Sequence, residues 1–223
     1  MKMKTKAWLL CTVIAAACLL MMFTDGIWQP GYVVKSAVKI AVFLALPLTL
    51  YPVMGISLAS HFRPDKASVL KGGLLGLATI AVILGGYWLL HPYIDLSAIP
   101  QALEQDTGIT KENFLYVALY IALCNSLLEE FFFRGFSYLG LAHHAGKTFA
   151  AVFSSLTFAV YHAGMLITML NPVLYILALT ALAGCGLFFI FLNRSGNIWT
   201  SWLVHMGANI GINVIAMILL GIL

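Results

Sequence analysis

The chain has 223 residues, of which 62% are hydrophobic and 9% carry a charge, and its formal net charge is +4. Soluble globular proteins carry a charge on about a quarter of their residues, so this composition excludes a soluble fold. We therefore expect an integral membrane protein surrounded by a lipid bilayer. The small basic excess gives no reason to expect a nucleic-acid partner.

Seven apolar runs follow one another along the chain, each close to the length that a membrane-spanning helix needs, about 20 residues. They cover residues 7–23, 39–60, 72–90, 114–133, 148–170, 173–192 and 198–223. Small residues and glycines within most runs favour close helix packing. The predicted fold class is all-α, a polytopic transmembrane helical bundle of about seven spans.

The basic residues predict the orientation, because loops rich in Lys and Arg stay in the cytoplasm. With the N terminus inside, three basic residues lie outside, namely Lys35, Lys39 and Lys111. The other nine lie on the cytoplasmic side, at Lys2, Lys4, Lys6, Arg63, Lys66, Lys71, Arg134, Lys147 and Arg194. We expect a cytoplasmic N terminus and, from the short loops, a bacterial plasma membrane.

Ionisable residues inside a membrane are functional candidates, because burying a charge there costs at least about 2.5–3.5 kcal/mol. The fourth run contains Glu129-Glu130-Phe-Phe-Phe-Arg134. Residues four apart share a helix face, so Glu130 can pair with Arg134 while Glu129 points elsewhere. Glu129 is then left without a partner in its own helix, and we expect it to act as a general base.

Two later runs each contain a histidine. His162 ends Phe158-Ala-Val-Tyr-His162, and His205 begins His205-Met-Gly-Ala-Asn209. His205 and Asn209 share one face of the last helix, where two donors could stabilise an oxyanion. His162 could share a water with Glu129 or bind a metal. Each residue alone could also be a packing hydrogen bond between helices.

These three motifs, in this order and in separate apolar runs, resemble the CPBP family, the CAAX-protease and bacteriocin-processing membrane proteins. The resemblance covers residues 114–223 and predicts a catalytic core there, after N-terminal transmembrane helices at 1–113. It implies an endopeptidase in which Glu129 and His162 activate a water. His205 and Asn209 would stabilise the oxyanion, and Glu130 with Arg134 would support the site.

The resemblance leaves the role of a metal open. We expect no cofactor, because an amide such as Asn209 is an uncommon zinc ligand and the sequence has no His-Glu-x-x-His. The alternative is a zinc site formed by Glu129, His162 and His205.

The expected function is hydrolysis of a peptide bond in a peptide or membrane-protein substrate. A serine mechanism is a distant option, because Ser126, Ser154 and Ser155 have no convincing base at helical spacing. The alternative to an enzyme is a non-catalytic membrane protein of bacteriocin immunity or partner stabilisation. A proton-coupled transporter is a third possibility.

Overall fold

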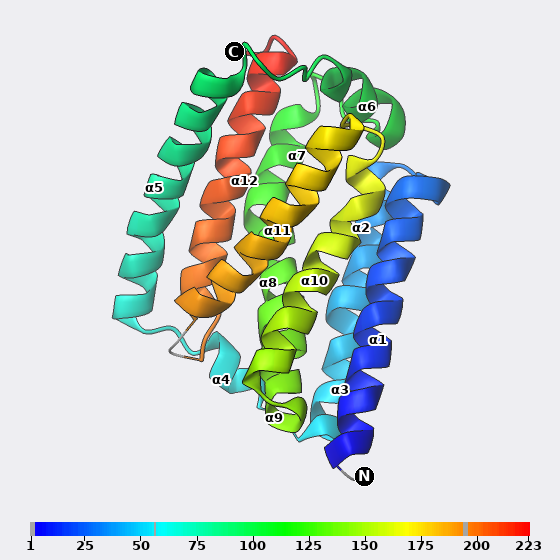
Figure 1. The fold of residues 1–223 in the computed structure, drawn as a ribbon, viewed down its shortest axis with the longest axis vertical. Helices are drawn as coiled ribbons and strands as arrows, with labels where there is room; N and C mark the ends of the chain where they lie inside the picture. Colours follow the sequence, from blue (N-terminus) through cyan, green and yellow to red (C-terminus); the bar gives the residue numbers. More distant parts are fainter. Residues whose placement is uncertain (1–2, 56, 194–195) are drawn as a thin grey trace.

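The computed structural model describes residues 3–55, 57–193 and 196–223, and these residues form helices and no strand. Seven helical rods are long and apolar enough to cross a bilayer, which confirms the predicted fold class. The rods are Met3–Trp28, Tyr32–Met54, Lys66–Leu90, Phe114–Ala145, Lys147–Leu166, Pro172–Leu192 and Trp199–Leu219. They run alternately up and down, so the N and C termini lie at opposite ends of the bundle (Figure 1).

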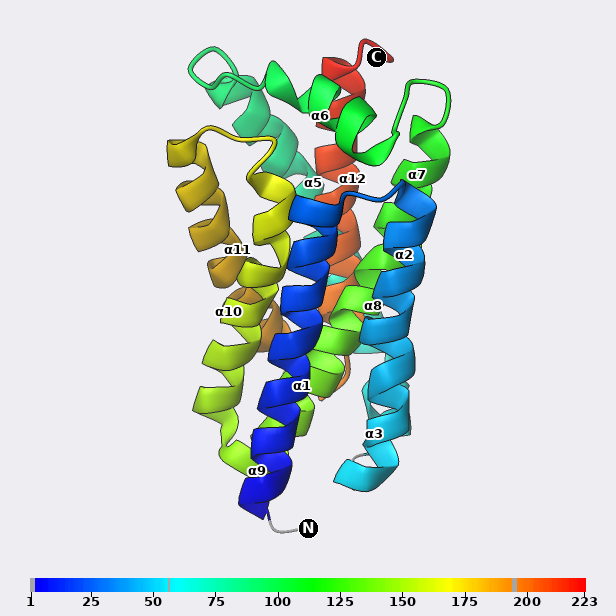
Figure 2. The same ribbon diagram turned by 90° about the vertical axis from the view of Figure 1, so that its right-hand side faces the viewer.

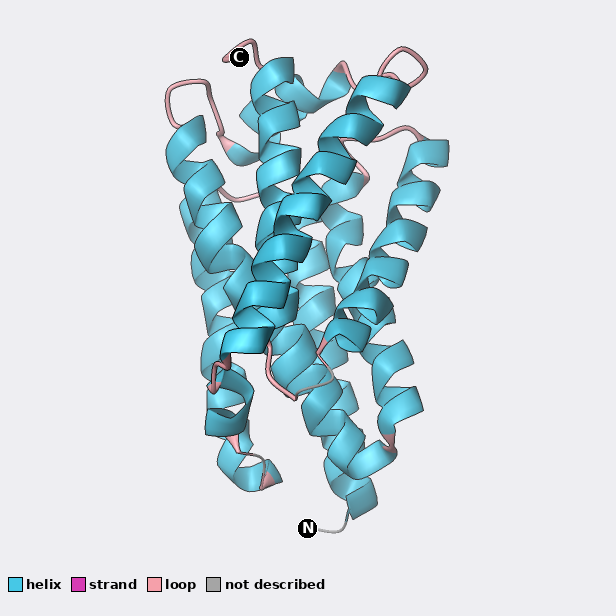
Figure 3. Cartoon of the chain, turned by 90° about the vertical axis from the view of Figure 1, so that its left-hand side faces the viewer, coloured by secondary structure: helices cyan, strands magenta, loops and turns pink. Residues whose placement is uncertain are grey.

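Several rods contain short π-helical segments within the α-helix. The elements are α1 (Met3–Phe23), η1 (Thr24–Trp28), α2 (Tyr32–Ile40), η2 (Ala41–Ala45), α3 (Leu46–Met54), α4 (Leu58–Phe62), α5 (Lys66–Leu90), α6 (Ala98–Thr107), α7 (Phe114–Tyr120), η3 (Ile121–Asn125), α8 (Ser126–Glu130), η4 (Phe131–Gly140), α9 (Leu141–Ala145), α10 (Lys147–Leu166), α11 (Pro172–Leu192) and α12 (Trp199–Leu219). The loops gather at the two ends of the bundle (Figure 3).

Two of the differences from the predicted span boundaries affect the candidate site. The second span begins at Tyr32, so Lys35 and Lys39 lie within a spanning helix and not in an outer loop. The fourth span continues to Ala145, although the sequence predicts a connection from residue 135 to 147. Gly146, with φ +87°, is the break that separates it from the fifth span. The apolar pattern misplaced both boundaries because polar residues inside a packed bundle resemble loop residues.

Glycines let the helices approach one another closely, as predicted. An added Cβ on Gly207 of α12 would lie 2.5 Å from the carbonyl oxygen of Gly76 in α5. An added Cβ on Gly26 would lie 3.0 Å from the Cα of Gly164 in α10. Apolar side chains such as Val33 and Val82 are more than 70% exposed on the outside of the bundle, the surface that lipid covers.

The short helix α4 closes the N-terminal end beneath α12. The backbone N–H of Ile198 donates to the carbonyl of His61 over 3.1 Å, and the Trp199 indole N–H donates to the carbonyl of Phe62 over 3.0 Å. His61, near a predicted membrane edge, is itself buried, and its Nδ1 lies 3.1 Å from the Tyr51 hydroxyl oxygen. Burial lowers the pKa of His61 to about 4.

Candidate active site

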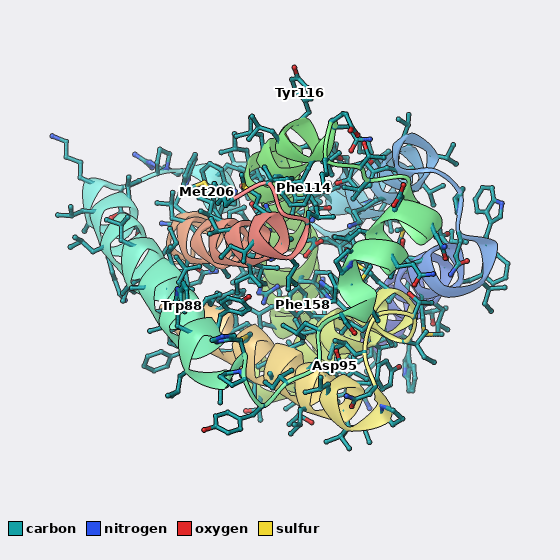
Figure 4. The ribbon with its side chains drawn as sticks, turned by 90° about the horizontal axis from the view of Figure 1, so that it is seen from above. Trp88, Asp95, Phe114, Tyr116, Phe158 and Met206 are labelled. Atoms are coloured by element: carbon teal, nitrogen blue, oxygen red, sulfur yellow. The ribbon has the colours of Figure 1, made fainter. Side chains whose placement is uncertain are left out.

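One residue from each of the three motifs meets the others inside the bundle, at the carboxylate of Glu129 in α8. Glu129 is 2% exposed and Glu130 is fully buried. Figure 2 shows α8 running behind α1 and between α10 and α2. His162 is contributed by α10 and His205 by α12, so three of the last four spans supply one site. Figure 4, seen from above, shows Phe158 inside the bundle and Tyr116 at its outer edge.

One oxygen of Glu129 is surrounded by donors. Its Oε1 accepts hydrogen bonds from the Asn125 amide over 2.7 Å, the Tyr161 hydroxyl over 2.7 Å and the Lys39 ammonium over 3.3 Å. Asn125 precedes Glu129 by four residues in the same helical rod, so the expectation that Glu129 lacks a partner in its own helix is wrong. The spacing that pairs Glu130 with Arg134 also pairs Asn125 with Glu129.

The other oxygen of Glu129 faces two imidazoles. Its Oε2 lies 3.8 Å from Nε2 of His162 and 3.7 Å from Nε2 of His205. Both separations are too long for a direct hydrogen bond and are suited to a shared water. The structure therefore brings together the carboxylate and both histidines that the sequence predicts.

Hydrogen bonds on the far side of each ring fix the direction of these histidines. Nδ1 of His162 lies 2.7 Å from the Phe158 carbonyl, and Nδ1 of His205 lies 2.9 Å from Oε1 of Glu130. A carbonyl or carboxylate oxygen only accepts, so each Nδ1 carries the proton that is donated. In a neutral ring, Nε2 then presents a lone pair toward Glu129.

Glu130 and Arg134 form the expected ion pair, and Glu130 also contacts His205. The Arg134 Nη1 lies 3.3 Å from Glu130 Oε1, and the guanidinium lies over the rings of Phe158 and Phe189, at 4.4 and 4.7 Å from their centroids. Arg134 is 1% exposed and lies within the helix of the fourth span, not at its end as the apolar run predicts.

The extended fourth span also removes a conflict of depth between Glu129 and His162. If the fourth span ended near Arg134, as the apolar run predicts, Glu129 would lie five residues from that end, whereas His162 lies fifteen residues after Lys147. Measured instead from Ala145 and Lys147, where the two spans end, the depths are roughly 24 Å for Glu129 and roughly 22 Å for His162 at 1.5 Å per residue. The two residues therefore lie at the same level, near the middle of the fourth span.

Asn209 has a partner outside the Glu129 cluster. Its amide donates to the Ile121 carbonyl over 3.2 Å, and Asn213, one turn later, donates in the same way to the Ala118 carbonyl over 3.1 Å. Ile121 begins the π-helical segment η3, where the helix repeat changes. Both amides thus join α12 to the fourth span. The oxyanion role of Asn209 stays a prediction.

The sequence reasoning missed the contacts of Lys39, Asn125 and Tyr161 with Glu129. Lys39 and Glu129 together are neutral, as are Arg134 and Glu130, so the cluster places two balanced pairs in the bundle. Lys39 lies inside an apolar segment that begins at Tyr32, and this position in the sequence indicates a lysine that needs a partner within the bundle. The four-residue spacing was the signal for Asn125.

The donor set was compared with what a zinc ion needs. A tetrahedral zinc with bonds of about 2.0–2.1 Å places its ligand atoms about 3.4 Å apart. The distances from Glu129 Oε2 to the imidazoles are 3.7 and 3.8 Å, and the Lys39 ammonium lies 3.3 Å from the other oxygen. No group of three His, Cys, Asp or Glu among the described residues has the geometry of a metal site. The Lys39 ammonium is the feature of this donor set that disfavours a divalent cation.

This fold and site define an α-helical membrane protein with a carboxylate and two imidazoles converging inside the bundle, an arrangement suited to acid–base chemistry. Residues 111–211 match the family model described as type II CAAX prenyl endopeptidase Rce1-like. The match confirms the resemblance to CPBP membrane proteases over these residues. Comparison with curated proteins gave no significant match, and neither did comparison with solved structures.

Proposed function

We propose that the protein is an intramembrane endopeptidase that hydrolyses a peptide bond with a water activated by Glu129. The observation that supports this most is the convergence of His162 Nε2 and His205 Nε2 on Glu129 Oε2, at 3.8 and 3.7 Å. A water among these atoms can donate one proton to the carboxylate and another to an imidazole lone pair. Its oxygen is then a better nucleophile.

In the proposed reaction the water oxygen attacks the carbonyl carbon of the substrate, and its proton passes to Glu129 Oε2. The C–N bond then breaks, and the proton moves from Glu129 to the leaving nitrogen. The products are a new carboxyl terminus and a free amine. No bond forms between the protein and the substrate, so no acyl-enzyme is part of the reaction.

The other motif residues act through this water or on the oxyanion. His162 orients the water. Glu130, held by Arg134, accepts from His205 Nδ1 and thereby directs Nε2 of that ring toward the reacting atoms. Asn209 would donate to the oxyanion, with its second amide hydrogen or after leaving the Ile121 carbonyl. His205 would join it as an imidazolium, in which Nε2 also carries a hydrogen.

A metal-independent reaction is part of the proposal. The positive charge of Lys39 beside Glu129 opposes the binding of a cation at the same carboxylate. Activity that survives a strong zinc chelator would support this reading. Activity that is lost with the chelator and restored by zinc would instead assign Glu129, His162 and His205 as ligands.

The basic residues support a cytoplasmic N terminus. Lys4, Lys6, Lys66 and Lys147 all lie at or near helix ends on the side of the bundle where the chain begins (Figure 1). Lys111 precedes α7 at the opposite end. This asymmetry favours the N-terminal side as cytoplasmic.

Comparative mass spectrometry of membrane peptides tests the activity and identifies the substrate. Membranes containing the wild type are compared with membranes containing the Glu129→Gln variant, which preserves shape and removes the base. A peptide pair with a new carboxyl terminus that is present only with the wild type supports the proposal and names the cut bond. Identical peptides in both samples, with both proteins folded, would favour a non-catalytic role. The match to a protease family does not favour that role.

A further inference from the structure

Lys39 lies in α2, outside residues 111–211, yet its ammonium reaches the proposed base. The Nζ atom lies 3.3 Å from Glu129 Oε1 and donates to Asn125 Oδ1 over 2.7 Å. It also donates to the Tyr161 hydroxyl and lies 4.9 Å from the centre of that ring. The side chain is 12% exposed, so most of it is removed from the surroundings of the bundle.

The chemistry of these donors fixes the direction of each hydrogen bond. An ammonium can only donate, so the Tyr161 oxygen accepts from Lys39 and its own hydrogen points to Glu129 Oε1. Likewise, the Asn125 oxygen accepts from Lys39, which leaves its amide hydrogens to donate to the same Oε1. Lys39 therefore orients both of the other donors as well as contacting the carboxylate itself.

With three donors on Oε1, the second oxygen of Glu129 is left to face the imidazoles. The carboxylate cannot rotate without breaking contacts to all three donors. Arg134 pairs with Glu130, whereas Lys39 pairs with Glu129, so each carboxylate has its own cation. A charge-assisted contact of this kind is stronger than a neutral hydrogen bond, particularly away from water.

We propose that Lys39 is a positioning residue for hydrolysis, which holds Glu129 so that Oε2 faces His162 and His205. The inference rests on the proposed function and deepens it. It implies that the second span completes the active site, although the family match begins at residue 111. The N-terminal helices would then belong to the catalytic unit and not only to its membrane anchor.

The test measures kcat and KM of purified protein in detergent on an internally quenched peptide ending in Cys-aliphatic-aliphatic-X, in farnesylated and unmodified forms. In Lys39→Met we expect kcat to fall about 100-fold with KM within about threefold, because the lost donors act on the base. Lys39→Arg, which keeps the charge, should recover part of kcat. Lys35→Met is the matched control one turn earlier. Lys35 pairs with Asp25 at 3.8 Å, so its loss should leave the donors on Glu129 Oε1 in place and kcat within about threefold of wild type.

Thermal unfolding supplies a readout that does not need a substrate. Lys39→Met should lower the unfolding temperature when Glu129 is present and have little effect in the Glu129→Gln background, because only the first combination leaves a buried carboxylate without its cation. If Lys39→Met does not fold, Lys39→Met with Glu129→Gln should fold. Failure of that double variant would show a general packing role and overturn the proposal.

The outcomes separate the two proposals. Glu129→Gln that cleaves as fast as wild type would overturn the proposed function itself. An inactive Glu129→Gln beside a Lys39→Met variant with unchanged kcat would overturn the role of Lys39 alone. Equal losses of kcat in Lys39→Met, Lys39→Arg and Lys35→Met would also overturn it, because a positioning role predicts a graded series.

Discussion

Substitution of Gly207 by alanine should disturb both stability and the active site. The new Cβ would lie 2.5 Å from the Gly76 carbonyl oxygen, whereas ordinary contacts begin at 3.4 Å, so α12 must move about 0.9 Å away from α5. His205 lies two residues before Gly207, and its Nδ1 is 2.9 Å from Glu130. A displacement of this size at His205 would take this contact out of hydrogen-bond geometry.

We expect Gly207→Ala to cost about 1–3 kcal/mol by overpacking. For a chain of this size, that corresponds to a fall in unfolding temperature of roughly 3–10 °C. The value of kcat should fall at least about tenfold, because misplaced catalytic groups are costly. Fluorescence-detected thermal unfolding and cleavage of the quenched peptide measure the two effects.

Gly73→Ala is the control in α5 itself, where an added Cβ meets no atom within 4 Å. Its stability should be unchanged or higher by up to about 1 kcal/mol, since alanine favours the helix. If Gly207→Ala matched Gly73→Ala in both measurements, the close approach of α5 and α12 would not position His205.

Three further predictions concern other parts of the molecule. Because the pKa of His61 is about 4 in the folded protein and ordinarily 6.5, the unfolded chain binds more protons between these values. The free energy of unfolding should therefore fall by about 2 kcal/mol from pH 7 to pH 4, and this part of the pH dependence should be absent in His61→Gln. Arg134→Lys should lower the unfolding temperature and kcat, because an ammonium cannot stack as the guanidinium does on Phe158; equal values in both proteins would contradict that reasoning. Ser154→Ala removes a bond to the Phe133 carbonyl and should cost about 1 kcal/mol without loss of kcat, whereas an inactive variant would point to a serine mechanism.

The sequence predicts the parts of the site that depend on short spacing. Glu130 and Arg134 are four residues apart in one rod, and the structure pairs them. Intramembrane ionisable groups are rare enough that Glu129, His162 and His205 could be expected to converge, and they do. The number of spans follows in the same way, because each apolar run must cross the bilayer.

The remaining features depend on contacts between distant segments. Lys39 is 90 residues from Glu129, and no local pattern reveals which carboxylate it pairs with. The apolar count also treated Lys39 as a boundary, since an unpaired lysine would be unfavourable in lipid. The balanced pair makes it tolerable. Asn209 is the opposite case. Its four-residue spacing from His205 predicts a shared site, whereas its amide donates to the Ile121 carbonyl.

Cleavage of the quenched peptides by wild type and Glu129→Gln in H₂¹⁸O tests whether Glu129 activates the water that attacks the peptide bond. We expect the wild type to cleave the peptide, with one ¹⁸O in the new carboxyl group and no trapped covalent intermediate. Glu129→Gln should remain folded and be slower by at least about 1,000-fold, since the base that accepts the water proton is gone. Equal rates in the two proteins, or a covalent peptide adduct on the wild type, would contradict direct attack by a water that Glu129 activates.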